Sequence, residues 1–518
     1  MAPPPATAGP RAPFIADSDA RDTDLEKPLL ASRVATAAPP RRRGVLKALF
    51  PELTSQGVII LLCLINLVNY LDRGIIPGAP EKFEHFISRT LHIDVTQQSL
   101  YLGILASAFI ASYSVCTMVF GYLALTHRPF RTIAFGMSVW VLAVIVCGFA
   151  KYMESYYVLL FGRILSGVGE ASFQCNATPF IDTHAPKEKR ALYMGIFLAS
   201  ITVGTALGYV YGSSLAASSF GWSAAFFLEG ALMVALILAC LVCVPTELDV
   251  VPKDHSHQVD KKAGLESKSS RSFVAEWGAI FSDPTFALVV LGHAAYTFSL
   301  AALSVFSPVI FIGLGLFKTE TQVSMVFGGI IVVTGTIGTP LGGIFVDRLL
   351  KRKAKDWRCY VSVASLFYFA LIAETLALVM MLFTGVKYAF LGFLACCFLF
   401  LCALSPAETI AVMELFPASR RSMAIAANTL VIHALGDVPS PIILGWLKDT
   451  WAPRCGTVEI DGEAKLNPDC WKDRAGLRDV LLFAVLWLVW AVVLWGAALV
   501  VIKRIQRHKS SASTASRV

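Results

Sequence analysis

About twelve apolar runs, each long enough to cross a bilayer as a helix of about 20 residues, dominate this sequence. They begin near Gly57, Ser99, Thr132, Tyr156, Leu192 and Ser223, and again near Phe286, Val323, Val361, Tyr388, Met423 and Val480. Backbone polar groups cannot face lipid without partners, so segments of this kind span a membrane as helices. We therefore predict an all-α polytopic membrane protein with about twelve transmembrane helices in two six-helix bundles.

The composition of the 518 residues excludes most other classes of protein. Hydrophobic residues make up 56% of the chain and charged residues 15%, whereas soluble domains average about 25% charged residues. The net charge of +8 is spread over loops, which does not favour a nucleic-acid partner. No metal-ligand spacing, nucleophile–base pair or phosphate-binding loop is evident in the sequence, so we expect no enzyme activity, no metal and no cofactor.

A polar stretch divides the runs into two sets of six and defines the domain organisation. We expect a disordered cytoplasmic tail at 1–50, an N-terminal six-helix bundle at 51–246, a cytoplasmic linker at 247–275, a C-terminal six-helix bundle at 276–504 and a cytoplasmic tail at 505–518. The first tail is rich in Pro, Ala and charge, a composition that cannot bury a core. Two bundles related as parallel repeats place a substrate cavity between them near the midplane.

Basic residues occupy alternate loops and predict the orientation in the membrane. They precede the first run and follow the second, fourth, eighth, tenth and twelfth, as at Arg128, Lys351 and Lys503. Cytoplasmic loops carry such an excess, so both termini and the linker are expected in the cytoplasm. The tract Asp24–Leu30 resembles an acidic dileucine sorting signal. This tract favours an endolysosomal or vacuolar membrane over the plasma membrane.

The first and fourth runs contain charges that membrane helices rarely carry. An ionisable group inside a bilayer costs roughly 2.5–3.5 kcal/mol on insertion scales, and such groups are usually functional. The first run carries Asn69, Tyr70, Asp72 and Arg73, and the fourth carries Arg163 and Glu170. The proton affinity of a buried carboxylate changes when a neighbouring cation moves, so Asp72 and Glu170 are candidates for proton coupling.

Arg73 is the candidate for holding a substrate headgroup. Its planar guanidinium suits a phosphate or a carboxylate, and Asn69 and Tyr70 lie beside it in the sequence. An alternative interpretation is that Asp72–Arg73 and Arg163–Glu170 are inert pairs that hold helices in register. We favour that structural role for Arg163 alone, because a buried arginine often clamps neighbouring helices.

The eleventh run supplies a polar stripe from the second half of the chain. His433 and Asp437 are one helical turn apart, Ser440 follows, and two prolines, Pro439 and Pro441, are expected to kink or break the helix. This stripe is expected to form the second half of the cavity. For His433 a packing role and a functional role are equally consistent with the sequence.

Two cysteines lie together in a long polar loop, apart from those in the apolar runs. Cys455 and Cys470 are in the segment before the twelfth run, on the side of the membrane opposite the basic loops. A thiol pair on an oxidising side favours a structural disulfide. We therefore predict a bond between these two residues.

Several of these segments resemble a known transporter family. Asn69-Tyr70-Leu71-Asp72-Arg73, with twelve helices, resembles the major facilitator superfamily. Three further segments resemble the spinster family of lipid transporters within it: Arg163–Ser172, Pro417-x-x-Arg420-Arg421-Ser422, and His433-x-x-Gly436-Asp437-x-x-Ser440-Pro441. The similarity runs from about Asn66 to Asp449.

The resemblance implies export or efflux of lysophospholipid or sphingosine-1-phosphate-type lipids by alternating access, in some members coupled to protons. It implies that Asp72, Arg73 and Glu170 form the coupling and headgroup site. The expected partners are thus an amphiphilic lipid, protons and the surrounding membrane lipid, for a protein that works as a monomer. Two alternatives stay open: an organic-anion/proton symporter of the same superfamily, and a membrane sensor that does not transport.

One loop departs from the superfamily pattern. The loop between the second and third helices normally carries Gly-x-x-x-Asp-Arg, but here Gly121 is followed by Leu125 and Thr126. The second copy of the motif is intact at Gly343, Asp347 and Arg348. The cytoplasmic gate must therefore depend on other residues, to which the intact copy is expected to contribute.

Overall fold

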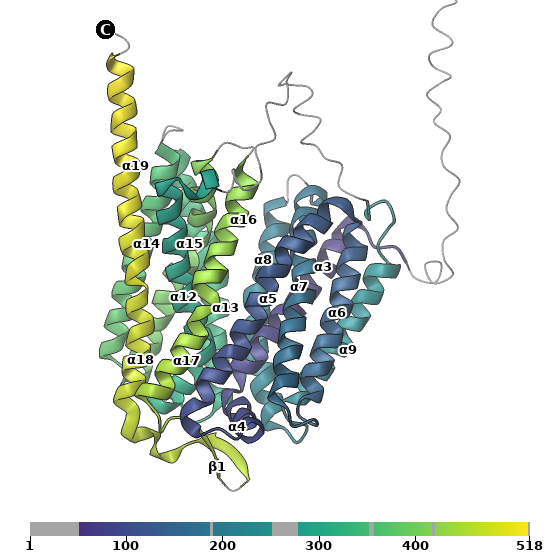
Figure 1. Cartoon of the computed structure of the whole chain (residues 1–518). Helices are drawn as coiled ribbons and strands as arrows, with labels where there is room; N and C mark the ends of the chain where they lie inside the picture. Colours follow the sequence, from purple (N-terminus) through teal and green to yellow (C-terminus); the bar gives the residue numbers. More distant parts are fainter. Residues whose placement is uncertain are drawn as a thin grey trace, which may run out of the picture. The chain divides into compact units, whose positions relative to one another are not determined.

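The computed structural model describes residues 51–186, 190–250, 278–351, 357–416, 420–460 and 462–515. The expected tail at 1–50 and most of the expected linker at 247–275 lie outside these ranges, as does the Asp24–Leu30 tract. Within them the chain is a bundle of long helices, with one small hairpin at one end (Figure 1). Eleven helices among the described residues are long and apolar enough to cross a membrane.

The first six long helices form the N-terminal half. They are α3 (Ser55–Gly78), α5 (Gln98–Thr126), α6 (Pro129–Phe149), α7 (Tyr156–His184), α8 (Arg190–Ala217) and α9 (Ser223–Val242). Thr54 begins α3 by accepting a hydrogen bond from the backbone N–H of Gly57. Helix α7 is 29 residues long but is not among the eleven apolar spans, because it carries Arg163, Glu170 and other polar residues. Together with the eleven apolar spans, α7 brings the described residues to the twelve long helices that the sequence predicts.

The C-terminal half repeats this arrangement. It contains α12 (Pro284–Gly313), α13 (Glu320–Lys351), α14 (Arg358–Leu382), α15 (Lys387–Leu415), α16 (Arg421–Ile432) with α17 (Pro439–Trp451), and α18 (Arg474–Trp487) with α19 (Val489–Ala515). Asp283 begins α12 by accepting from the backbone N–H groups of Thr285 and Phe286. Helix α19 continues beyond residue 504, where the sequence predicted a tail.

The eleventh span does not break at its prolines. A π-helical turn, His433–Asp437, joins α16 to α17, and the backbone N–H of Val438 bonds to the carbonyl of His433 five residues earlier, at 3.0 Å. Pro439 then stands at the first position of α17, where a missing N–H is tolerated. The wider turn therefore accommodates the prolines, and π-turns of this kind are frequent at functional sites.

Short elements that the sequence did not predict cover one end of the bundle. They are α4 (Pro80–Leu91), the 3₁₀ turns η1 (Val95–Gln97) and η6 (Pro468–Asp473), and the antiparallel hairpin of β1 (Thr457–Ile460) and β2 (Glu463–Leu466). A disulfide joins Cys455 to Cys470 across the base of this loop. We call this the hairpin end; in Figure 1 it is the lower end, and the C-terminal end of α19 marks the opposite end.

Close backbone contacts hold neighbouring helices together within and between the halves. A Cβ atom on Gly208 of α8 would lie 2.2 Å from the carbonyl oxygen of Leu71 on α3, so these two helices approach as only glycine allows. Between the halves, Gly103 of α5 is equally close to the backbone of Pro441 on α17. Ser99 and Gly445 make a second such contact near the hairpin end.

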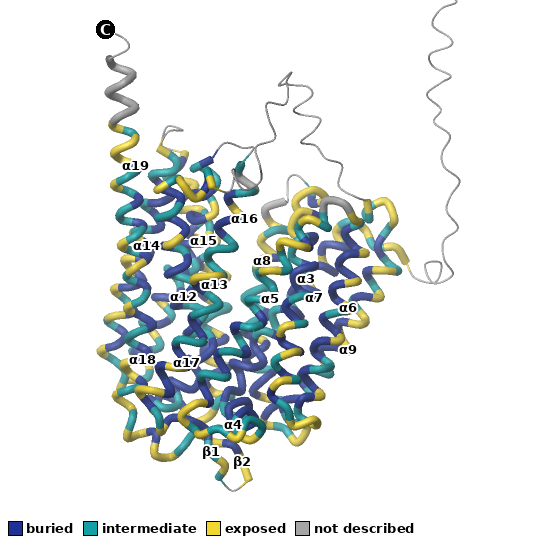
Figure 2. The backbone as a smooth tube through the Cα atoms, viewed as in Figure 1, coloured by how far each residue is buried: buried dark blue, intermediate teal, exposed yellow. Residues whose placement is uncertain are grey.

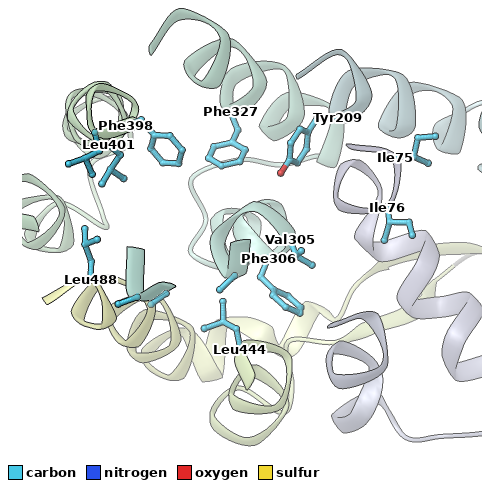
Figure 3. Close-up of a cluster of buried hydrophobic side chains, with 14 of the residues drawn as sticks. Ile75, Ile76, Tyr209, Val305, Phe306, Phe327, Phe398, Leu401, Leu444 and Leu488 are labelled. Atoms are coloured by element: carbon cyan, nitrogen blue, oxygen red, sulfur yellow. The ribbon is translucent and has the colours of Figure 1, made fainter. Parts of the chain in front are cut away.

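Apolar side chains fill the interior and also cover the outside. Aromatic packing continues across the halves, since the rings of Tyr209 on α8 and Phe327 on α13 are 5.6 Å apart, edge to face (Figure 3). Exposed positions, yellow in Figure 2, are spread along the outer helices. The exposed residues include large apolar ones such as Ile60, Leu64 and Phe135. A soluble surface would not carry so many, whereas lipid tails would cover them.

Candidate functional site

Asp72 and Arg163 form a buried ion pair between α3 and α7. Nη1 of Arg163 donates to both carboxylate oxygens of Asp72, at 2.7 and 2.9 Å, and Ser166 Oγ adds a bond of 3.2 Å. The exposed fractions of the two charged side chains are 4% and 0%. Glu229 of α9 lies near the same pair. Neither charge could stay in this place without the other, because an unpaired buried charge costs about 3–5 kcal/mol.

Arg73 and Glu170 form a second pair one position further along α3. Nη2 of Arg73 donates to Glu170 Oε1 at 2.5 Å, and Nε lies 3.5 Å from Oε2. Glu170 is fully buried, whereas 23% of the Arg73 side chain is exposed. The guanidinium lies 4.5 Å from the ring centre of Tyr70 and 5.1 Å from that of Tyr113, so two aromatic faces also stabilise its charge.

The pairing of these four charges differs from the inert pairs, Asp72–Arg73 and Arg163–Glu170, that the sequence left open as an alternative. Asp72 bonds Arg163 and Arg73 bonds Glu170, so both pairs join α3 to α7. Adjacent residues on a helix point in directions about 100° apart. The side chains of Asp72 and Arg73 therefore cannot meet each other, and each meets a different turn of α7.

A cavity of about 220 Å³ lies against the second pair, between the two halves. It is lined by Tyr70, Arg73, Ile76, Pro77, Ala106, Phe109, Ile110, Arg163, Thr205, Tyr209, Ala301, Ser304, Val305 and Asp437. Figure 3 shows three of these apolar and aromatic side chains, Ile76, Tyr209 and Val305. We call it the central cavity. Its wall is mostly apolar, with Arg73 as a partly exposed cation.

The remaining predicted residues of the first half lie behind this wall. Asn69 is fully buried, and within the described part of the chain neither of its side-chain amide atoms has a hydrogen-bond partner. Asn66, one turn earlier, is instead fully bonded, because its amide donates to Ser200 Oγ at 2.9 Å and accepts from Gln174 at 2.8 Å. Of these two asparagines, Asn69 is therefore the one whose side-chain amide is still available for a new partner.

The π-helical turn brings the second half to the central cavity. Nδ1 of His433 lies 2.6 Å from Asp437 Oδ2, and Asp437 is one of the lining residues. The His433 ring meets Tyr113 of the first half edge to face, with 5.8 Å between centroids. Ser440 is fully buried, and its hydroxyl has no partner among the described residues.

The motif at the end of α13 lies away from this cavity. Asp347 and Arg348 are exposed, and a Cβ atom on Gly343 would lie 3.7 Å from the ring of Pro406 on α15. The side chains of Leu125 and Thr126, where the sequence departs from the superfamily pattern, lie outside the described part of the chain. The gating role that the sequence assigned to this motif stays a prediction.

Sequence reasoning missed a buried charge cluster that joins the halves at the hairpin end. Nζ of Lys448 on α17 donates to Glu84 of α4 at 3.0 Å and to Ser99 of α5 at 2.6 Å. Thr457 of β1 donates to the other Glu84 oxygen at 2.9 Å. Asp449 accepts the backbone N–H groups of Ser99 and Leu100. The signal was visible, since Lys448 and Asp449 are charges near the end of an apolar run.

Comparisons with known proteins agree with this architecture. Residues 62–441 match the sequence profile of the Major Facilitator Superfamily. A protein of Arabidopsis thaliana described as "Probable sphingolipid transporter spinster homolog 2" is 31% identical over 411 residues, which cover 76% of this chain and 81% of the relative. The human "Protein spinster homolog 1" is 26% identical over 423 residues, covering 77% of this chain and 75% of that protein.

A solved structure shares the fold. It is a bacterial homolog to the human lysosomal transporter Spinster, in an inward-facing and unoccupied conformation, which aligns with a TM-score of 0.67 at 18% identity. The alignment covers 87% of this chain and 98% of that one. With an apolar cavity between two six-helix halves and a profile match over most of its length, this chain belongs to the major facilitator superfamily and, within it, to the spinster family of transporters.

Proposed function

We propose that this transporter moves lysophospholipids or sphingosine-1-phosphate-type lipids by alternating access, and that Arg73 and Glu170 couple the lipid headgroup to a proton. The observation that carries the proposal is the position of this pair. Glu170 is fully buried, and among the described residues its charged partner in contact is Arg73, whose side chain is partly exposed at the central cavity. A ligand that reaches Arg73 therefore acts on Glu170.

The coupling follows from competition for the guanidinium. A phosphate or carboxylate headgroup that binds Arg73 through two parallel hydrogen bonds replaces Glu170 as its partner. The carboxylate is then a buried charge without a cation, and such a group takes up a proton. Protonation of Glu170 equally releases Arg73 for the headgroup. Binding of proton and headgroup is thus mutually favourable, as linkage requires.

The wall of the central cavity favours an amphiphile over a small polar solute. Arg73 is the one partly exposed arginine among the lining residues. The apolar part of the lining consists largely of Ile76, Pro77, Phe109, Ile110 and Val305. At about 220 Å³ the cavity is below the size of sites that enclose whole drug-sized ligands. It would hold a headgroup and the start of a chain, with Asn69, Tyr70 and Ser440 as nearby polar groups and His433 and Asp437 on the second half.

Asp72 and Arg163 have a structural role in this proposal. Their two short hydrogen bonds and nearly complete burial support a fixed link between α3 and α7. Proton exchange at Asp72 would leave Arg163 as a buried charge without its partner, which is costly. Of the two candidates for proton coupling that the sequence suggested, Asp72 and Glu170, the proposed proton site is therefore Glu170.

The structure represents a state closed at the hairpin end, where Glu84, Ser99, Lys448 and Thr457 join the halves. We place this end on the non-cytoplasmic side, because the basic loops lie at the opposite end and a disulfide suits an oxidising side. Both termini are then cytoplasmic. The Asp24–Leu30 tract favours an endolysosomal or vacuolar membrane.

Uptake into proteoliposomes tests the proposal. The purified protein should transport a lysolipid or sphingosine-1-phosphate, and a pH gradient should stimulate this transport. Glu170→Gln should lose most of the stimulation, because its amide cannot take up the proton. Glu374→Gln is a matched control, since Glu374 is also a buried membrane glutamate, on α14.

Three outcomes would contradict the proposal. A preference for small water-soluble anions would identify an organic-anion symporter instead. Absence of turnover with either class, in a preparation that binds the lipid, would indicate a sensor. An unaltered response to the pH gradient in Glu170→Gln would remove Glu170 from the coupling role.

A further inference from the structure

A second cluster of ionisable groups lies in the C-terminal half, apart from the lining residues of the central cavity. Nδ1 of His293 on α12 is 3.0 Å from Glu408 Oε1 on α15. Asn428 of α16 donates to the same carboxylate oxygen at 2.8 Å, and its own oxygen lies 3.3 Å from His293 Nδ1. Three helices thus each contribute one polar side chain to a single point.

The cluster is buried deeply enough for its charge to matter. The exposed fractions of the His293 and Glu408 side chains are 14% and 10%. With a proton on both ring nitrogens, His293 neutralises Glu408, and the cluster has no net charge. Without that proton the cluster carries a buried negative charge, which is costly in a medium of low polarity. The geometry therefore favours a bound proton.

Among the described residues, the charged groups that act on His293 come from two other elements. The charged groups that act on it are Glu408 on α15 and Asp437 on the π-helical turn, and the ring of Tyr296 on its own helix stacks 5.9 Å away. His433 is the partner of Asp437. Two histidine–carboxylate pairs thus lie in the same half, one at the central cavity and one behind it.

The two pairs are mechanically connected through α12. A Cβ atom on Gly436, in the π-helical turn, would lie 2.2 Å from Thr297 Oγ1 and 2.8 Å from the carbonyl oxygen of Ala294. Ala294 follows His293 directly, and Thr297 Oγ1 donates to the His293 carbonyl at 3.1 Å. A shift of α12 at His293 would therefore change the packing of the turn that carries His433 and Asp437.

We propose that His293, Glu408 and Asn428 form a second proton-binding site, separate from Glu170, whose occupancy controls the His433–Asp437 turn beside the central cavity. The proton binds the imidazole nitrogen that is unprotonated in the neutral ring, and the carboxylate of Glu408, 3.0 Å from Nδ1, is its counter-charge. Chains of histidine and acidic residues inside membrane helices commonly carry protons in transporters. Where transport is proton-coupled, as proposed above, loss of this site should weaken the pH dependence without abolishing transport.

A titration that needs no transport tests the site itself. The protein contains nine histidines, so selective ¹³C labelling of their rings gives few signals, and His293→Gln identifies the one that belongs to His293. In the parent protein this signal should change between pH 5 and pH 9. In Glu408→Gln its midpoint should move to lower pH by about one unit or more, because the counter-charge at contact distance is gone.

Matched variants make the result decisive. Glu374→Gln removes another buried carboxylate of the same half and should leave the His293 midpoint unchanged. If Glu408→Gln does not fold, Glu408→Asp takes its place. It keeps the charge but shortens the side chain, so the His293 midpoint should move in the same direction by a smaller amount. A His293 signal that is constant from pH 5 to pH 9 would overturn the proposal, and so would equal midpoints in the parent and Glu408→Gln. Neither result depends on whether the protein transports lipid.

Discussion

Removing the positive charge at the hairpin end should open that end of the protein. In Lys448→Met an apolar side chain of similar length replaces the lysine, and Glu84 is left fully buried without a cation. Breaking a buried pair in this way costs about 3–5 kcal/mol. The cost applies only to the closed state, because Glu84 meets water when the end opens. At about 1.4 kcal/mol per tenfold change, the closed state should lose a factor of roughly 10² to 4 × 10³ in population.

Labelling of a cysteine in the central cavity measures this shift. Ala106 lines the cavity on α5, and Ala106→Cys can be introduced after the ten free cysteines are replaced, with the Cys455–Cys470 disulfide kept. A membrane-impermeant maleimide added from the hairpin side should label it slowly in the parent and at least tenfold faster in Lys448→Met. Lys465→Met is the matched control, because Lys465 pairs with Glu463 on the exposed hairpin, where such a pair contributes little.

A double variant separates the charge effect from a loss of packing. In Glu84→Gln combined with Lys448→Met, Glu84 no longer carries a buried charge that lacks its cation, so slow labelling should return in large part. Equal labelling rates in the parent and Lys448→Met would refute the reasoning. Fast labelling that persists in the double variant would show that packing, and not charge, closes this end.

Three further perturbations test other parts of the structure. Asp72→Asn should lower the thermal unfolding temperature measured in detergent, because Arg163 loses its counter-ion, whereas Arg89→Gln, at an exposed pair, should not. Gly208→Val should abolish folding, judged by size-exclusion chromatography, because its Cβ would overlap the Leu71 carbonyl, and Gly385→Ala, where the structure leaves open space, is the control. Burial beside Glu84 raises the pKa of Glu81 to about 7 at the closed hairpin end, so protonation stabilises closure at low pH and this contribution is lost as the pH rises through about 7. Cavity labelling from the hairpin side should therefore be slower at pH 6 than at pH 8, and a pH effect that is unchanged in Glu81→Gln would contradict this assignment.

The long helices could be predicted from the sequence because the bilayer allows little else. An apolar run of sufficient length has to be a helix, so the expected start near Gly57 became a helix from Ser55 and the one near Ser223 began there. Even α7 could be placed, although Arg163 and Glu170 lower its hydropathy. The elements missed were α4 and the hairpin, which lie in polar segments where length and hydropathy give no constraint.

Partner choice inside the membrane could not be predicted in the same way. The sequence showed that Asp72, Arg73, Arg163 and Glu170 were all inside helices, but the pairing depends on the rotation of α3 relative to α7. That rotation is set by the glycine contact between α3 and α8 and by the packing of α7 against α5. His293 was missed for a related reason, since Glu408 and Asn428 are more than 100 residues away in the sequence and a lone histidine indicates no partner.

Counting protons during ligand binding tests the central claim most directly. Purified protein in a weakly buffered solution with a pH-sensitive dye is mixed with sphingosine-1-phosphate or a lysolipid near neutral pH. If the headgroup replaces Glu170 as the partner of Arg73, one proton should be taken up for each lipid bound. In Glu170→Gln this uptake should disappear while the lipid still binds. The same proton uptake in the parent and in Glu170→Gln, or lipid binding to the parent without any uptake, would contradict it.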